Sequence, residues 1–186
     1  MELYLIRHTT PKIAKGICYG QTDLDLVSGY EKEIEQIHQN MDKSLEHIFS
    51  SPSKRCSLLA NSFQSTVQEE SRLLELNFGD WEMKMWKDIP QPALNIWMDK
   101  YISQGPPQGE SYEQLKNRVV EIFKGIISQN RATTGIITHA GPIRAILSYL
   151  LNIPLKDSFT LKIDYGSITK ISLHDAAFSV DYINKK

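Results

Sequence analysis

The chain has 186 residues, 41% of them hydrophobic and 23% charged, which is the composition of an ordinary globular protein. Its 21 Lys and Arg and 22 Asp and Glu give a formal net charge of −1, so no overall basic field indicates a nucleic-acid partner. No apolar run approaches the roughly 20 residues that cross a bilayer, and no signal peptide precedes the first predicted strand. We therefore expect a cytoplasmic protein without a membrane partner.

A single domain is expected over residues 1–186. This length suffices for one sizeable core, and the chain contains no internal repeat, low-complexity tract or linker. The two cysteines, Cys18 and Cys56, have no metal or redox spacing, and we expect small buried thiols. The sequence carries no signal for an oligomeric state.

The first predicted strand ends in an arginine and a histidine. Leu3 to Ile6 is an uninterrupted apolar run, and Arg7 and His8 follow it before Pro11 ends the segment. In open α/β sheets, ligands bind beyond the carboxyl ends of the strands. Arginine is a forked cation suited to phosphate, and a neutral histidine can act as a nucleophile or proton carrier. The alternative is a strand end that runs into solvent, and in either case we expect an exposed His8 side chain.

A long loop, residues 12–27, follows this strand. Long loops in compact domains are often functional. Gly16 and Gly20 allow the backbone to approach a ligand, and Tyr19 and Gln21 can contact one. A surface loop pinned by Tyr19 and Leu24 is the alternative.

The next elements bring a second arginine to a strand end. A helix is expected from Ser28, because Ser28 and Glu31 have the spacing of a capping box. Residues 48–51 predict a short strand, and Pro52 suits the first turn of the helix that follows. Arg55 then lies in that first turn, where backbone N–H groups and the helix dipole favour an anion. A solvated charge is the alternative for Arg55.

The middle of the chain supplies carboxylates and tryptophans. A short extended stretch over residues 66–74 leads to three candidates for a general acid, with loop charges or helix caps as the alternative: Glu75, Asp80 and Glu82. Trp86 and Trp97 occur in the region that follows, of which about residues 94–102 are expected to be helical, and we expect both side chains to pack rather than to stack on a ligand. Ser111 is expected to cap a long amphipathic helix.

A second histidine follows another buried strand. Residues 134–138 predict a buried strand, and His139 and Ala140 follow it before a helix begins. The first strand likewise has a histidine directly after it. Three later segments alternate like strands: residues 159–163, 167–173 and 178–183. Strands alternating with helices predict an α/β fold, a three-layer sandwich with a mostly parallel sheet and helices on both faces.

The predicted sheet gathers the candidate residues at one edge. The strand ends bring together two arginines and two histidines within reach of Glu75: Arg7, Arg55, His8 and His139. Such a cleft suits a tetrahedral oxyanion, and phosphoryl transfer needs little from a protein beyond positioning and charge stabilisation. No carboxylate cluster has metal-ligand spacing, so we expect neither a metal nor another cofactor.

Five elements in this order resemble the histidine phosphatase superfamily, which includes phosphoglycerate mutases and acid phosphatases. Residues 7–9 (Arg-His-Thr) resemble its Arg-His-Gly signature, and residues 51–55 its Ser-Pro-x-x-Arg element. Residues 75–79 resemble the segment with the family's acid, 109–111 (Gly-Glu-Ser) a further element, and 138–141 (Thr-His-Ala-Gly) the second histidine motif. The resemblance runs along nearly the whole chain.

This resemblance implies a phosphoglycerate mutase-like fold and a metal-independent phosphomonoesterase with a phosphohistidine intermediate. It implies that His8 attacks phosphorus and that Glu75 protonates the leaving alcohol before water hydrolyses the phosphoenzyme. Three residues would hold the phosphoryl oxygens: Arg7, Arg55 and His139. Further contacts to a small-molecule phosphomonoester are expected from Thr9, Tyr19, Gly20, Gln21 and Ala140.

The chain departs from the family pattern at two points. Thr9 stands where the family usually has glycine, and residues 14–15 lack the asparagine that many members carry, which argues against a mutase, as does the short chain. Within the family, residues 7–9 and 16–23 are most similar to the α-ribazole phosphatases, which remove a 5′-phosphate during assembly of the lower ligand of cobalamin. The alternatives are a phosphatase for other small phosphomonoesters and a phospho-ligand binding module without turnover. A module of that kind typically lacks a catalytic residue, and all are present here.

Overall fold

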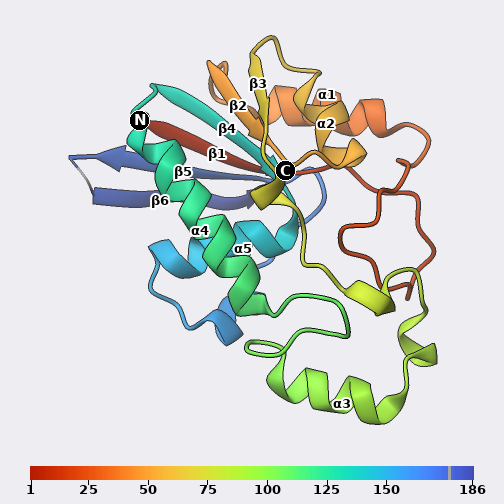
Figure 1. The fold of residues 1–186 in the computed structure, drawn as a ribbon. Coiled ribbons are helices and arrows are strands. Elements are labelled where there is room, and N and C mark those ends of the chain that lie inside the picture. Colours follow the sequence, from red (N-terminus) through yellow and green to blue (C-terminus); the bar gives the residue numbers. More distant parts are fainter. Residues whose placement is uncertain (176) are drawn as a thin grey trace.

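The computed structural model describes residues 1–175 and 177–186, and one six-stranded sheet forms its centre in the order β3-β2-β4-β1-β5-β6 (Figure 1). The strands are β1 (Glu2–Arg7), β2 (His47–Ser50), β3 (Thr66–Glu69), β4 (Thr133–Thr138), β5 (Ile168–His174) and β6 (Ala177–Lys185). The first four in spatial order, β3 to β1, are parallel, whereas β5 pairs antiparallel with β1, and β6 with β5. The sheet is therefore mostly parallel, as predicted.

Helices cover both faces of the sheet: α1 and α2 lie on one face, and α4 and α5 on the other (Figure 1). The helices are α1 (Tyr30–Asn40), α2 (Lys54–Ala60), α3 (Gln91–Lys100), α4 (Tyr112–Ser128) and α5 (Ala140–Leu150). The 3₁₀-helices are η1 (Ser71–Leu73), η2 (Gly79–Trp81), η3 (Trp86–Asp88) and η4 (Leu155–Thr160). These layers confirm the predicted α/β sandwich. No helix among the described residues has both the length and the apolar character needed to cross a membrane.

Strand β1 buries side chains on both faces of the sheet. Leu3 and Leu5 belong to the core beneath α4 and α5, whereas Tyr4 and Ile6 belong to the core beneath α1 and α2. A central parallel strand that is covered on both sides needs apolar residues at every position, which explains the uninterrupted run. Both cysteines are buried free thiols, as expected.

The ends of several helices agree only in part with the sequence. Ser111 caps α4, as predicted, and Gln114 completes a capping box with it. The capping box predicted for α1 is wrong, because Gly29 is the N-cap, with a φ of 83°, and no side chain caps the helix. This left-handed conformation suits glycine and separates Ser28 from the first turn. Pro52 likewise precedes the N-cap of α2 instead of lying in its first turn.

Two other segments differ from their predictions. Residues 159–163 were expected to form a strand, but they comprise the end of η4 and irregular chain. Phe159 packs against the rings of Tyr101 and Tyr112, with centroids 5.6 and 5.1 Å away, instead of joining the sheet. Helix α3 begins at Gln91, earlier than expected, with a proline in its first turn. Trp86 lies before it, in η3.

Candidate active site

The carboxyl ends of β1, β2 and β4 lie side by side, because β4 pairs in parallel with both of its neighbours. Arg7 ends β1 and His8 follows it, while His139 follows β4 and precedes α5. The ring centroids of His8 and His139 are 5.0 Å apart. Arg55 lies in the first turn of α2, directly after β2. The strand ends thus bring the four residues to one edge of the sheet. Arg7, His8 and His139 line a pocket there, whereas Arg55 is fully buried and is not among its lining residues.

A pocket of about 340 Å³ opens at this edge of the sheet. Its lining includes four polar or charged side chains, Arg7, His8, Glu75 and His139, and we call this group the anion end. It also includes six rings that contact one another, and we call this group the aromatic end: Phe78, Trp86, Trp97, Tyr101, Tyr112 and Phe159. Trp86 and Trp97 were expected only to pack, and they do stack on each other, with centroids 5.9 Å apart, but they also form part of the pocket wall.

His8 is held as a neutral imidazole with one free nitrogen. Its side chain is only 1% exposed, which corrects the expectation of an exposed strand end. Nδ1 lies 2.7 Å from the Thr9 carbonyl oxygen, and because a carbonyl can only accept, Nδ1 carries the proton. Burial, and then the charges of Arg55 and Arg7, hold the pKa of His8 well below its usual value. Nε2 therefore retains its lone pair near neutral pH and can act as a nucleophile.

His139 is oriented by Ser51, the first residue of the Ser-Pro-x-x-Arg element. Its Nε2 lies 2.9 Å from the hydroxyl of Ser51, which accepts the backbone N–H of Ser53 at 3.4 Å and can donate to the histidine. Burial, and then the proximity of His8 and Arg55, hold the pKa of His139 well below its usual value. In the tautomer in which Nε2 accepts from Ser51, Nδ1 carries the proton, and this buried atom has no partner among the described residues. His139 can thus offer one N–H donor to a ligand.

The two arginines are fixed by backbone carbonyl groups. Arg7 donates from Nη1 to the Ile163 oxygen at 2.7 Å. Arg55 is fully buried and donates to the oxygens of Thr22 and Gly20, at 2.9 and 2.6 Å. Within residues 1–175 and 177–186, Nε of each arginine is buried without a hydrogen-bond partner. Cations with unused, buried donors favour an anionic ligand.

Glu75 reaches the pocket from the segment after η1. Its carboxylate accepts the backbone N–H of Gly141 at 3.2 Å and that of Leu76 at 2.9 Å. A Cβ on Gly141 would lie 2.1 Å from Glu75 Oε1, so only glycine leaves room for this carboxylate. The other two acid candidates lie outside the pocket lining. Asp80 is exposed on η2, and Glu82 accepts backbone N–H groups of the loop at Gln21 and Thr22.

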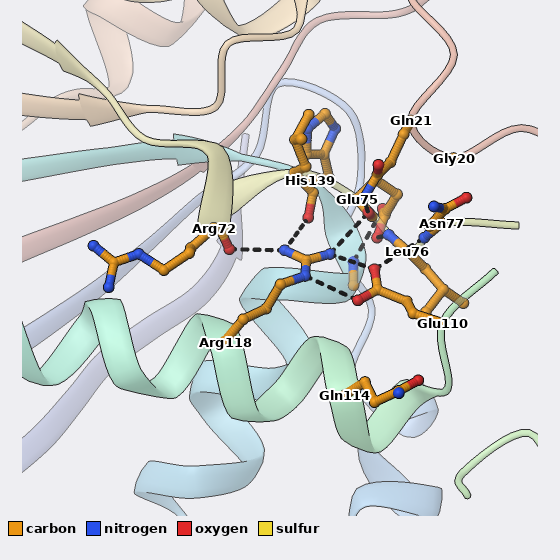
Figure 2. Close-up of polar contacts among 12 residues, drawn as sticks. Gly20, Gln21, Arg72, Glu75, Leu76, Asn77, Glu110, Gln114, Arg118 and His139 are labelled. Atoms are coloured by element: carbon orange, nitrogen blue, oxygen red, sulfur yellow. Dashed lines mark hydrogen bonds and ion pairs between the residues drawn. The ribbon is translucent and has the colours of Figure 1, made fainter. Parts of the chain in front are cut away.

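An ion pair behind the pocket anchors the segment that carries Glu75 (Figure 2). Arg118 of α4 pairs with Glu110 at 2.6 Å and donates to the Glu75 carbonyl oxygen at 2.9 Å. It also donates to the carbonyl oxygens of Arg72 and Leu74. Glu110 belongs to the Gly-Glu-Ser element noticed in the sequence, but Arg118 belongs to none of the recognised motifs, so only the fold reveals it.

The predicted substrate contacts fall into two groups. Tyr19 and Ala140 line the pocket. Thr9, Gly20 and Gln21 are not among its lining residues. The Thr9 carbonyl holds His8, the Gly20 carbonyl holds Arg55, and the Gln21 side chain donates to the Glu75 carbonyl at 3.0 Å. These three residues support the pocket from behind.

The site contains cations but no metal-ligand cluster. In the part of the chain that the structure describes, no group of three or more His, Cys, Asp or Glu could hold a metal ion. The arrangement offers a neutral nucleophilic imidazole, two fixed guanidinium groups, one histidine donor and one carboxyl group. Together they suit attack on a phosphoryl group and protonation of the group that leaves.

Comparisons with known proteins agree with this chemistry. The adenosylcobalamin/α-ribazole phosphatase of Escherichia coli strain K12 is 22% identical, and the match covers 100% of this chain and 97% of the relative. Phosphoserine phosphatase 1 of Hydrogenobacter thermophilus is 25% identical over 94% of this chain and 88% of its own length. The crystal structure of the α-ribazole phosphatase from Shigella flexneri has the same fold, with a TM-score of 0.92, 22% identity, and coverage of 100% of this chain and 96% of that one.

The model of one protein family, the histidine phosphatase superfamily (branch 1), matches residues 3–186. This match includes all of the residues that line the pocket. The chain therefore belongs to the histidine phosphatase superfamily, as a hydrolase of the phosphatase type.

Proposed function

We propose that this phosphatase hydrolyses α-ribazole 5′-phosphate, a small-molecule phosphomonoester, through a phosphohistidine at His8. The observation that carries the proposal is the pocket itself. A buried, neutral His8 with a free Nε2 lies at its anion end, and the same pocket continues into an aromatic end. We also propose that the protein is cytoplasmic and that its reaction involves neither a nucleic acid nor a membrane.

In the first step, Nε2 of His8 attacks phosphorus, the P–N bond forms and the bond from phosphorus to the alcohol oxygen breaks. The protonated Glu75 gives its proton to the leaving oxygen. The guanidinium groups of Arg7 and Arg55 and the Nδ1–H of His139 stabilise the charge on the other phosphoryl oxygens.

In the second step, the Glu75 carboxylate takes a proton from a water molecule that attacks phosphorus. The P–N bond breaks, inorganic phosphate leaves, and His8 regains its lone pair on Nε2. Glu75 is then protonated again for the next turnover. Both steps conserve protons without a metal ion.

The aromatic end supports an aromatic leaving group. α-Ribazole carries a benzimidazole base, and such a base gains from stacking against rings such as Trp86, Trp97 and Phe159. The volume of about 340 Å³ lies within the usual range for small-molecule sites. The name of the full-length relative from E. coli points to the same substrate.

A second candidate substrate is a phosphomonoester that carries a carboxylate. Arg144 of α5 lines the pocket and donates from Nε to the Leu161 oxygen at 3.0 Å. Its Cζ lies 5.3 Å from the centroid of the Phe159 ring. Burial lowers the pKa of Arg144, which marks a cation that has lost part of its hydration. A substrate carboxylate would offset this loss, and phosphoserine, named in the relative from H. thermophilus, has one.

A substrate panel tests the proposal. We expect kcat/KM for α-ribazole 5′-phosphate to exceed that for a 5′-nucleotide, phosphoserine and phosphoethanolamine. Phosphoserine and phosphoethanolamine differ only in a carboxylate, so a strong preference for phosphoserine that Arg144→Gln removes would favour the second candidate. Absence of turnover with every ester, together with retained phosphate binding, would instead indicate a binding module.

A further inference from the structure

Two tyrosines from distant loops meet beside the phosphoryl-binding arginines. The hydroxyl groups of Tyr19 and Tyr165 are hydrogen-bonded to each other, although 146 residues separate them. The ring of Tyr165 stacks on Arg7, whose Cζ lies 3.6 Å from the ring centroid, and it lies 5.5 Å from the His8 ring. The ring of Tyr19 lies 5.8 Å from Cζ of Arg55. Each tyrosine thus contacts a different arginine.

The segment that carries Tyr165 is fastened to the nucleophile. Gly166 donates its backbone N–H to the oxygens of both Arg7 and His8, at 3.2 and 3.1 Å. The backbone N–H of Arg7 donates in turn to the Ser167 oxygen, and its side chain donates to the Ile163 oxygen. Gly166 has a φ of 67°, a conformation that favours glycine. Tyr165 therefore has a fixed position relative to Arg7 and His8.

The segment that carries Tyr19 holds the other arginine. The carbonyl oxygens of Gly20 and Thr22 accept both terminal nitrogens of Arg55, one and three residues after Tyr19. Backbone bonds between Cys18 and the segment at residues 83–84 fix this loop as well. The hydroxyl bond between the tyrosines therefore joins the support of Arg7 to the support of Arg55.

Arginine side chains have many rotamers, and phosphoryl transfer requires that their donors keep fixed directions while the phosphorus centre changes shape. The geometry points to Tyr19 and Tyr165 as a pair of positioning residues that hold both arginines in their phosphoryl-binding orientations. Tyr165 fixes the guanidinium plane of Arg7 by stacking. Its hydrogen bond to Tyr19 fixes the segment that supports Arg7 relative to the segment that supports Arg55. Burial and the bond to Tyr165 raise the pKa of Tyr19, so the hydroxyl remains a donor at neutral pH.

The test combines four variants and one control variant with measurements of phosphate binding and of kinetics. Because the inference rests on the proposed function, binding of inorganic phosphate is measured by calorimetry in addition to kcat and KM with p-nitrophenyl phosphate. Tyr165→Leu removes both stacking and hydroxyl, and we expect phosphate affinity to fall and kcat to fall by about 10–100-fold. Tyr165→Phe and Tyr19→Phe remove only the hydroxyl bond, and each is expected to lower phosphate affinity by about threefold.

The double variant Tyr19→Phe/Tyr165→Phe should bind phosphate no more weakly than either single variant, because all three lack the same bond. The matched control is Tyr182→Phe. Tyr182 lies on β6, away from the pocket, and donates a hydrogen bond to Asp42, so its loss should leave phosphate affinity and kcat unchanged.

Unchanged phosphate affinity and kcat in Tyr165→Leu would overturn the positioning role. Additive losses in the double variant would overturn the coupling of the two supports. If Tyr165→Leu fails to fold, the three phenylalanine variants at Tyr19 and Tyr165 still test the hydroxyl bond, and unchanged phosphate affinity in all three would overturn the proposal that this bond joins the two supports. If the wild-type protein binds phosphate but hydrolyses no ester, the proposed function fails while the binding measurements still test the tyrosines. A wild-type protein that binds no phosphate would overturn both.

Discussion

The two ends of the pocket are built in different ways. At the anion end, Arg7, His8 and His139 lie at the ends of central strands, and backbone groups or buried hydroxyls fix them. At the aromatic end, five of the six rings come from 3₁₀-helices, short loops and α3, which lies away from the sheet and has no buried residue (Figure 1). Only Tyr112 belongs to a helix that packs on the sheet, α4. The sheet thus supports the chemistry, whereas peripheral segments form the wall that meets the leaving group. Substitutions at the two ends should therefore have distinct effects.

The largest loss is expected from the nucleophile. His8→Ala should lower kcat by more than about 10³-fold on every substrate, because the proposed mechanism passes through a phosphoenzyme at His8. A phosphoramidate is acid-labile and comparatively base-stable, so an alkaline quench during turnover of a ³²P-labelled ester should trap label on the wild-type protein and none on the variant.

Because His8 is buried, its replacement needs a control for folding. His8→Asn fills more of the space, and both variants should retain cooperative thermal unfolding. Label on His139 would show that the two histidines have the reverse roles, and substantial activity in His8→Ala would refute the mechanism.

The acid should matter only where the leaving group needs a proton. Glu75→Gln is expected to slow hydrolysis of an alkyl phosphate by about 10²–10⁴-fold, but to affect p-nitrophenyl phosphate much less. Asp80→Asn is the matched control, because Asp80 is exposed outside the pocket lining and should change neither rate. Equal losses of Glu75→Gln on both substrates would indicate a structural carboxylate.

The aromatic end should discriminate between substrates. Phe159 is 51% exposed, so Phe159→Ser removes one ring from the wall without opening a cavity in the core. We expect kcat/KM for α-ribazole 5′-phosphate to fall by about tenfold, the scale of one base–aromatic contact, while phosphoethanolamine is hydrolysed as before. Comparable losses on both substrates would mean that the ring contacts no leaving group.

Acid should destabilise the anion end in particular. The pKa values of His8 and His139 are lowered in the folded protein, so below about pH 6.5 the unfolded chain binds more protons and stability declines. Between pH 7.5 and 5.5, His8→Asn should lose about 1 kcal/mol less free energy of unfolding than the wild type, measured with urea. An equal loss in both proteins would mean that His8 titrates normally.

The contrast between the two ends also explains what the sequence can predict. The sequence predicts Arg7, His8 and His139 as site residues, because each lies at the end of a buried strand and the carboxyl ends of parallel strands meet at one edge of the sheet. Arg118 acts through a hydrogen bond to Glu75, 43 positions away, and no local pattern encodes such a contact. Ser51 belongs to a recognised sequence element, but its bond to His139, 88 positions away, is evident only in the fold.

The aromatic end was less predictable for a related reason. The alternation of residues 159–163 is typical of a strand, yet Phe159 gains more by packing against Tyr101 and Tyr112 at the pocket. Tertiary packing decided the conformation of this short segment, as it does wherever an intrinsic preference is weak.

The smallest effect is expected from removal of metal ions. Two fixed guanidinium groups and the Nδ1–H of His139 can stabilise the phosphoryl charge that magnesium or zinc stabilises in other phosphatases. Treatment with EDTA should therefore leave kcat and KM unchanged on both alkyl and aryl phosphates, in wild-type protein and in Phe159→Ser alike. If EDTA abolished activity and a divalent ion restored it, the arginines would not be sufficient. The anion end would then need a cation in addition to its own residues.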